Sequence, residues 1–333
     1  MPDQVSRDYT TRRRQFGYVL AGALLAAGAL ARFPTPAPAT PQTDQTQVDQ
    51  SPIRVQVSLV SLFATVRDRR TKQIVSGLGQ DEFRITEDAK EQKIAFFSSE
   101  SKLPITLGLL IDTSGSQQYT LGAEQEAALR FFSRVMRKGD LSMVIGFDTD
   151  ANLLADFTDD QGMLGRAIRR TRVNSPVALG PLAQPPPGTV LYDAIYVACH
   201  DKLVSEAGRK ALVILTDAQD TGSRVSMQEA IEAAQRTDTV VHVLLIGDPR
   251  NFNMNEGVAK KIAEETGGRT IVVRNERNLE QAFDQISEEL RSQYTLGYYS
   301  SNGARDGSYR KIKVETTRKN LNVLTRRGYY ASE

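Results

Sequence analysis

The chain has 333 residues, of which 40% are hydrophobic and 25% are charged, and its formal net charge is +2. This composition is typical of a globular protein and excludes a chain that is disordered throughout. The first 39 residues contain five Arg and two Asp, so the remaining residues hold 37 of the 42 basic and 38 of the 40 acidic residues. Without a basic excess, the sequence does not favour nucleic-acid binding. The single cysteine, Cys199, excludes an intrachain disulfide.

Residues 1–39 have the layout of an export signal. Arginines at positions 12–14 precede a mildly apolar run at 17–31, and small residues follow. Arg13, Arg14 and Phe16 also resemble the twin-arginine (Tat) export motif. We therefore expect a signal peptide and an exported protein, either periplasmic or extracellular. An alternative is that residues 16–33 remain as an anchor in the inner membrane, although a full span needs about 20 apolar residues.

Residues 40–52 are rich in Pro, Thr and Gln and predict a flexible tether. Short β patterns follow at 53–100 and again at 293–333. Each set is thin for an independent core, so we expect the two to pair into one small β-sandwich with the central residues inserted between them. The expected strands are 54–66, 72–75, 82–85, 93–97, 294–299, 309–317 and 321–330, with a hairpin turn at 87–90.

Residues 101–292 alternate between strand and helix patterns. This alternation predicts a mostly parallel sheet with helices on both faces, and a hairpin at 141–157 supplies one antiparallel edge strand. The predicted fold class is therefore α/β, inserted in a small β-sandwich. The expected helices are 121–136, 163–170, 191–206, 227–236, 256–266 and 279–292.

Polar side chains follow the central apolar strand. Asp112, Ser114 and Ser116 are spaced two apart, so one carboxylate and two hydroxyls meet at the carboxyl end of the strand, where open α/β sheets bind ligands. Asp217 ends a second apolar strand, and Thr189 precedes a helix with its hydroxyl toward the same edge. Five oxygen donors of this kind suit a hard cation.

These segments resemble the von Willebrand factor A (VWA) family. The family's D-x-S-x-S signature, threonine segment and second aspartate strand correspond to DTSGS (112–116), GTVLYDA (188–194) and LTDAQD (215–220). The resemblance extends from Leu103 to about Ser292. The flanking segments at 77–97 and 294–300 resemble a bacterial subgroup of exported VWFA-related proteins.

The resemblance implies a Rossmann-like VWA domain with a metal-ion-dependent adhesion site (MIDAS), which usually holds Mg²⁺, with Mn²⁺ or Ca²⁺ as alternatives. Ser114, Ser116 and Thr189 would be hydroxyl ligands, and Asp112 and Asp217 would bind directly or through water. Such a site usually lacks one protein ligand. A Glu or Asp carboxylate of a partner protein can then complete the octahedron.

Two features depart from the family pattern. Ala218 stands where the family often has Gly, and three prolines at 185–187 lengthen and stiffen the loop before the threonine. Two further acidic residues are not placed among the ligands. We expect Asp193 to stabilise a helix N-terminus and Asp220 to shape the loop of the site.

Catalysis is less favoured. A serine hydrolase needs a base, and only His200 and His242 supply imidazole, one in a helix pattern and one in a buried strand. The chain has neither a G-x-S-x-G elbow nor a phosphate-binding loop. The absence of Cys and His near the ligands argues against Zn²⁺. Cys199 fits a core position better than a nucleophile.

The sequence thus predicts an exported, non-enzymatic adhesion or protein-recognition module that binds an acidic residue of a protein partner through a magnesium site. The alternative is an envelope scaffold or assembly factor that acts through the β-sandwich, with the metal site secondary. A metal-dependent hydrolase is a distant third.

Overall fold

The computed structural model describes residues 59–99, 103–173, 188–247 and 254–332. The predicted export signal, membrane anchor and tether lie outside these residues, as does the proline run at 185–187. No helix within the described ranges is long and apolar enough to cross a membrane.

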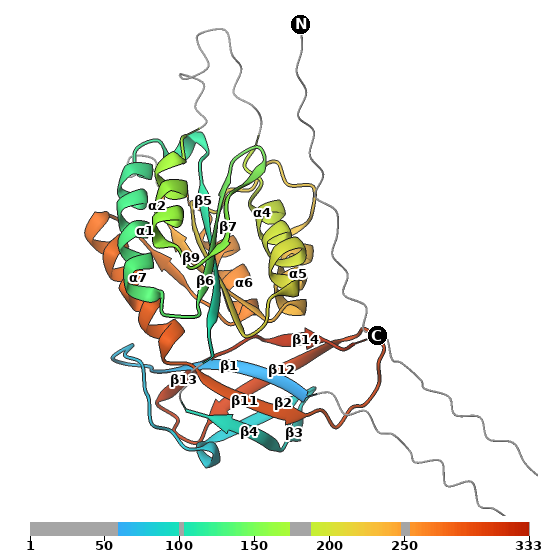
Figure 1. Cartoon of the computed structure of the whole chain (residues 1–333). Helices are drawn as coiled ribbons and strands as arrows, with labels where there is room; N and C mark the ends of the chain where they lie inside the picture. The colour runs from blue at the N-terminus through green and yellow to red at the C-terminus, as the bar shows by residue number, and fades with distance from the viewer. Residues whose placement is uncertain (1–58, 100–102, 174–187, 248–253, 333) are drawn as a thin grey trace, which may run out of the picture. The chain divides into compact units, whose positions relative to one another are not determined.

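A six-stranded sheet forms the centre of the domain between residues 105 and 291, in the order β10-β9-β8-β5-β6-β7 (Figure 1). Neighbouring strands pair in parallel, except that the edge strand β7 runs antiparallel to β6. This arrangement confirms the predicted sheet and its antiparallel edge. The strands are β5 (Ile105–Asp112), β6 (Leu141–Phe147), β7 (Ala151–Thr158), β8 (Arg209–Thr216), β9 (Thr239–Leu245) and β10 (Thr270–Val272).

Helices cover both faces of this sheet, as Figure 1 shows on either side of β5. One apolar core contains Leu107 and Leu109 of β5 with the helices of the first face, and a second core contains Leu110 with those of the other face. Because side chains alternate along a strand, every residue of β5 is buried on one side or the other. The first face carries α1 (Leu121–Val135), α2 (Gln161–Arg170) and α7 (Glu276–Arg291), and the second carries α4 (Leu191–Val197), α5 (Met227–Arg236) and α6 (Glu256–Thr266).

The two flanking segments pair with each other in two antiparallel four-stranded sheets, ordered β13-β1-β11-β4 and β14-β12-β2-β3. β1 pairs with β11 and β2 with β12, so each sheet takes strands from both ends of the chain. Leu62, Ile85 and Tyr298 share one core between these sheets. The predicted insertion is therefore confirmed. The strands are β1 (Leu59–Asp68), β2 (Phe83–Glu87), β3 (Lys90–Gln92), β4 (Ile94–Ser98), β11 (Tyr294–Tyr299), β12 (Tyr309–Thr316), β13 (Leu321–Leu324) and β14 (Gly328–Tyr330). The domain boundaries themselves stay predictions.

Three details of the strand and helix predictions were wrong. The strand expected at 72–75 is reduced to a single bridge between Ile74 and Arg67. The strand expected at 321–330 divides into β13 and β14, because the backbone N–H of Arg327 turns aside to donate to the Glu265 carbonyl at the end of α6. The helix expected at 191–206 ends at Val197 and continues as π and 3-10 turns, in which Ala198, Cys199 and Leu203 stay buried.

A buried ion-pair cluster links the β-sandwich to the central domain. Glu289 of α7 is 1% exposed and accepts hydrogen bonds from Arg67 of β1 and Arg269, each 2.6 Å long. His242 of β9 lies 3.9 Å from the same carboxylate. Because the carboxylate is removed from water, its two guanidinium partners supply the compensation that solvent would otherwise give.

We predict that Glu289→Ala lowers the free energy of unfolding by about 3–5 kcal/mol, because it leaves two partly buried cations without their partner. Chemical denaturation of the purified protein measures this change. The matched control is Asp284→Ala on the same helix, which breaks an exposed pair with Arg134 and should cost less than about 1 kcal/mol. Equal losses in the two variants would contradict the prediction.

Candidate metal centre

Asp112 is buried at the centre of the site and connects two of its segments. It ends β5, its side chain is fully buried, and its two carboxylate oxygens bind different segments. Oδ1 accepts from the backbone N–H of Ser114 at 2.9 Å, and Oδ2 accepts from the Thr216 hydroxyl at 2.7 Å. The first bond folds the chain after β5 into a tight Asx turn, and the second ties β5 to the end of β8.

The Asx turn brings the two serines together. The Ser114 and Ser116 hydroxyl oxygens lie 3.0 Å apart, and the chain continues as a 3-10 turn at Gly115–Gln117. Gln117 is fully buried and donates from Nε2 to the Ser116 hydroxyl at 3.2 Å. The loop therefore presents two hydroxyls beside the Asp112 carboxylate, and the hydrogen bond from Gln117 fixes the Ser116 hydroxyl.

Asp217 follows β8 and lies at the same end of the sheet. Its Oδ1 accepts from the backbone N–H of Gln219 at 3.0 Å, and its carboxylate also receives a hydrogen bond from Ser116. The next residue, Ala218, has a φ of +59° and is fully buried. That left-handed backbone explains why glycine suits this position, since a Cβ is disfavoured there.

Thr189 is attached to the site by hydrogen bonds to the loop after β8. Its backbone N–H donates to the Thr221 hydroxyl at 2.9 Å, and its carbonyl accepts from the backbone N–H groups of Thr221 and Gly222. A Cβ on Gly188, whose φ is +107°, would lie 2.8 Å from the Gly222 Cα. The positive φ and this close approach require glycine at position 188, and a Cβ on Gly222 would be tight, at 3.2 Å from the Gly188 Cα.

The bonds of Thr189 are thus to this loop, whereas Asp112, Ser114, Ser116 and Asp217 are connected with one another. Val190 fixes the threonine segment from the other side, because its backbone N–H donates to the Asp148 carbonyl at the end of β6 at 2.8 Å. The five predicted ligands are therefore placed by the ends of β5, β6 and β8.

The two additional acidic residues are placed as predicted, and each also bonds the other's segment. Asp193 lies in the first turn of α4, and Asp220 accepts a side-chain hydrogen bond within the loop after β8. Asp193 accepts from the backbone N–H groups of Arg224 and Val225, each at 2.9 Å, and so holds the loop after β8. Asp220 accepts from the backbone N–H of Tyr192 at 3.2 Å, and so caps α4 from a distance. The sequence did not predict these contacts between the two segments, because they depend on loops meeting across the site.

Negative charge accumulates in this buried region. Burial raises the pKa of Asp112 from 3.8 to about 7, and the neighbouring Asp217 adds to the rise. Burial also raises the pKa of Asp217. No cationic side chain is among the groups that shift either pKa within the described part of the chain. Two carboxylates without a positive partner are costly to bury, so the site is one that a cation would stabilise.

The donor set fits a hard divalent ion. Two carboxylates and three hydroxyls offer oxygen alone, which matches the preference of Mg²⁺ and Ca²⁺. Among the described residues, no group of three or more His, Cys, Asp or Glu side chains is placed to hold a metal.

The imidazoles and the thiol lie elsewhere. His242 packs against Glu289, and burial lowers its pKa to about 4. His200 is exposed, stacks on Tyr196 and hydrogen-bonds Asp201. Cys199 is in the core, and burial raises its pKa to about 12. In the described ranges, therefore, neither histidine is hydrogen-bonded to Ser114 or Ser116 as a general base.

Three residues near the site were missed by the sequence reasoning. Thr216 donates to Asp112, Gln117 supports Ser116, and Glu124 of α1 is a buried carboxylate whose charge interacts with the two aspartates. Only Glu124 left a signal in the sequence. It follows Leu121 by three residues and therefore lies on the buried face of an amphipathic helix, where a carboxylate is unexpected.

No protein-family model matches the chain, and no match is found among curated proteins. Several solved structures are similar in fold. BatB, a conserved hypothetical protein from Bacteroides thetaiotaomicron, is 20% identical with a TM-score of 0.45 over 56% of this chain and 97% of its own. A von Willebrand factor type A structure from Catenulispora acidiphila is 12% identical, with a TM-score of 0.47 over 83% and 74%.

Proximal thread matrix protein 1 from the mussel byssus, with a zinc-occupied MIDAS motif, is 13% identical. Its TM-score is 0.46, and the match covers 61% of this chain and 49% of that protein. In this chain, the strand order, the antiparallel edge strand and the helices on both faces form the architecture predicted from the resemblance. The fold is thus the Rossmann-like α/β fold that this resemblance implies. What this domain binds rests on its own residues.

We predict that Asp112→Asn changes how stability depends on pH in the metal-free protein. The raised pKa of Asp112 means that its protonated form stabilises the fold below pH 4, and that this stabilisation is lost as the pH rises through about 7. With EDTA, the variant should therefore gain roughly 2–4 kcal/mol relative to wild type between pH 4 and pH 8. Urea denaturation at both pH values measures the difference.

Mg²⁺ provides the complementary measurement at pH 8. It should raise the melting temperature of the wild type and leave that of Asp112→Asn unchanged, since only the wild type has the carboxylate that needs compensation. A variant that is less stable than the wild type at pH 8 in EDTA would show that Asp112 is compensated within the protein.

We predict that Thr189→Val weakens Mg²⁺ binding about tenfold, because it removes one hydroxyl donor while the backbone bonds of residue 189 remain. Isothermal titration calorimetry measures the affinity. Thr113→Val is the matched control, since the Thr113 hydroxyl bonds Phe147 and Asp148 instead. If both variants bind Mg²⁺ like the wild type, Thr189 is not a ligand.

Proposed function

We propose that this protein is an exported protein-recognition module that binds an acidic residue of a protein partner through a MIDAS-type Mg²⁺ site. Asp112, Ser114, Ser116, Thr189 and Asp217 hold the metal. The observation that carries the proposal is the pair of buried carboxylates, Asp112 and Asp217, next to serine hydroxyls and without a cationic side chain.

The chemistry of these donors favours binding over catalysis. Three of the five are neutral hydroxyls, so two carboxylates compensate a divalent ion only when they bind it directly. A metal that keeps an open position under these conditions attracts a further anionic oxygen. A Glu or Asp side chain of a partner supplies that oxygen, and no proton has to be transferred.

The position of the site suits recognition of a large partner. Ser116 is exposed and Ser114 is half-buried, whereas Asp112 and Asp217 lie beneath them. The buried carboxylates therefore bind the metal on its inner side, and a partner approaches the metal on the solvent side, past the serine hydroxyls. A side chain that projects from another protein can approach such a site.

Export rests on the amino-terminal sequence. The arginines at positions 12–14 and the apolar run after them support transport across the inner membrane, and the Tat-like motif supports transport in the folded state. The β patterns at 77–97 and 294–300 add the resemblance to exported bacterial VWFA-related proteins. The binding site would then meet partners of the envelope or the cell surface.

We predict that Asp112→Ala abolishes capture of the partner while the domain stays folded. The test is a pull-down from envelope extract in Mg²⁺ and in EDTA, with folding monitored by circular dichroism. Asp159→Ala, an exposed residue at the end of β7, is the matched control and should behave like the wild type. Capture that survives both EDTA and Asp112→Ala would refute the proposal.

A second candidate function is an envelope scaffold that acts through the β-sandwich. Its support is an exposed apolar patch on one face of the sheet, where Phe96 of β4 is 51% exposed and Leu59 of β1 is 49% exposed, on either side of Gly297 of β11. Among the described strands, β4 is also at the edge of this sheet, and an edge strand can accept a partner strand. In that case Phe96→Ser would reduce partner capture, whereas Asp112→Ala would not.

A further inference from the structure

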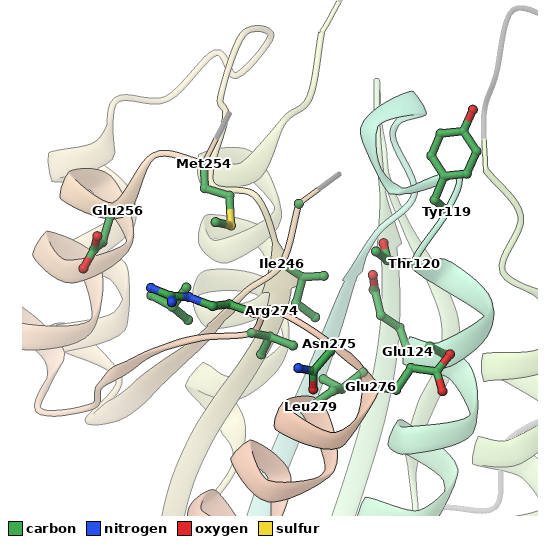
Figure 2. Close-up of a pocket in the computed structure, with 14 residues that line it drawn as sticks. Tyr119, Thr120, Glu124, Ile246, Met254, Glu256, Arg274, Asn275, Glu276 and Leu279 are labelled. Atoms are coloured by element: carbon green, nitrogen blue, oxygen red, sulfur yellow. The ribbon is translucent and has the colours of Figure 1, made fainter. Parts of the chain in front are cut away.

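A large pocket lies beside the candidate metal centre, next to the N-termini of α1 and α7. Its volume is about 890 Å³, which is within the range of small-molecule sites. Figure 2 shows it between α1 and the segments that follow β9 and β10. Most of its wall is apolar, formed by Ala123, Ile246, Met254, Val272, Val273 and Leu279.

One buried carboxylate interrupts this apolar wall. Glu124 lines the pocket from α1, is 0% exposed, and neither of its oxygens has a hydrogen-bond partner among the described residues. The nearby Thr120 hydroxyl only moderates its pKa, which burial raises from 4.5 to about 8. A buried carboxylate without a donor costs several kcal/mol unless it stays protonated or a ligand pairs with it.

The other charges of the pocket also favour a cation. Glu256 and Glu276 line it from the starts of α6 and α7, and both are exposed. Arg274 is the one cationic side chain among the lining residues, and Figure 2 shows it on the side opposite Glu124. Glu256 pairs with Lys260 at 2.6 Å, so Glu276 and the buried Glu124 are balanced only by Arg274, and the pocket is acidic.

We propose that this pocket binds an organic cation, an amidinium, guanidinium or primary ammonium group on an apolar body, whose charged end pairs with Glu124. A planar amidinium can donate to both carboxylate oxygens at once, which is the geometry that a carboxylate without other donors favours. The apolar body fills the space lined by Ile246 and Leu279. A hydrated metal ion fits less well, because one carboxylate in an apolar wall leaves most of its coordination sites empty.

Ligand binding in the pocket does not require the proposed metal-dependent function, although hydrogen bonds connect the pocket to the candidate metal centre. The backbone N–H of Glu124 donates to Thr120, and the Thr120 hydroxyl donates to Gln117, which in turn supports Ser116. Binding of the cation is therefore measured first in EDTA, where the metal centre is empty. Failure of the pocket and failure of the metal site can then be distinguished.

The test uses benzamidine as the cation and benzamide as its neutral counterpart, with affinities from isothermal titration calorimetry. Benzamidine should bind the wild type in EDTA, and benzamide should bind at least tenfold more weakly. Glu124→Gln should weaken benzamidine binding at least tenfold, because it keeps the shape of the side chain and removes the charge. Glu126→Gln, an exposed acidic residue on the same helix, should bind like the wild type.

Ala123→Phe is the second variant. Ala123 is half-buried at the pocket wall, so a phenyl ring there should fill the pocket and abolish binding while the helix stays intact. Circular dichroism shows whether each variant is folded. The proposal is overturned if the wild type does not bind benzamidine, if benzamide binds equally well, or if a folded Ala123→Phe protein retains the wild-type affinity.

Discussion

The burial of Asp112 at the end of the central strand is the constraint on which the rest of the site depends. β5 is covered on both faces, so its last side chain has no direct path to water and must find its partners within the protein. The Ser114 N–H and the Thr216 hydroxyl supply two hydrogen bonds, but neither carries a positive charge. The loop geometry that satisfies Asp112 is the same geometry that gathers the serine hydroxyls around it, and the charge is left for a cation.

Close backbone packing completes the site from a distant part of the chain. Gly188 lies so close to the Gly222 backbone that a Cβ on Gly188 would clash, and the Thr189 backbone is bonded to the loop that follows Asp217. Ala218 keeps a left-handed backbone in that loop at some cost in strain. Loops fixed in this way would hold the proposed ligands in place before a metal binds, which would lower the entropy cost of binding.

Uncompensated negative charge extends beyond the two aspartates to Glu124, whose pKa responds to both. The metal centre and the pocket therefore share one electrostatic environment, and a cation in either site reduces the repulsion felt by carboxylates of the other. The buried charge of Glu289, at the other end of the domain, is compensated in a different way. Its two arginine partners come from within the protein, one of them from the β-sandwich. A paired carboxylate joins domains, whereas an unpaired one marks a place for a ligand.

Local patterns were enough to predict the α/β fold, its insertion between paired β segments and most strands and helices, because periodicity of apolar residues follows directly from burial. The D-x-S-x-S spacing and the two further motifs also predicted which residues lie at the carboxyl edge of the sheet. The tertiary structure alone decided what faces them. The bonds of Asp193 and Asp220 to each other's segments and the pocket around Glu124 depend on segments far apart in the chain. The sequence records which side chains are polar, but whether a charge is compensated is set by what folding packs against it.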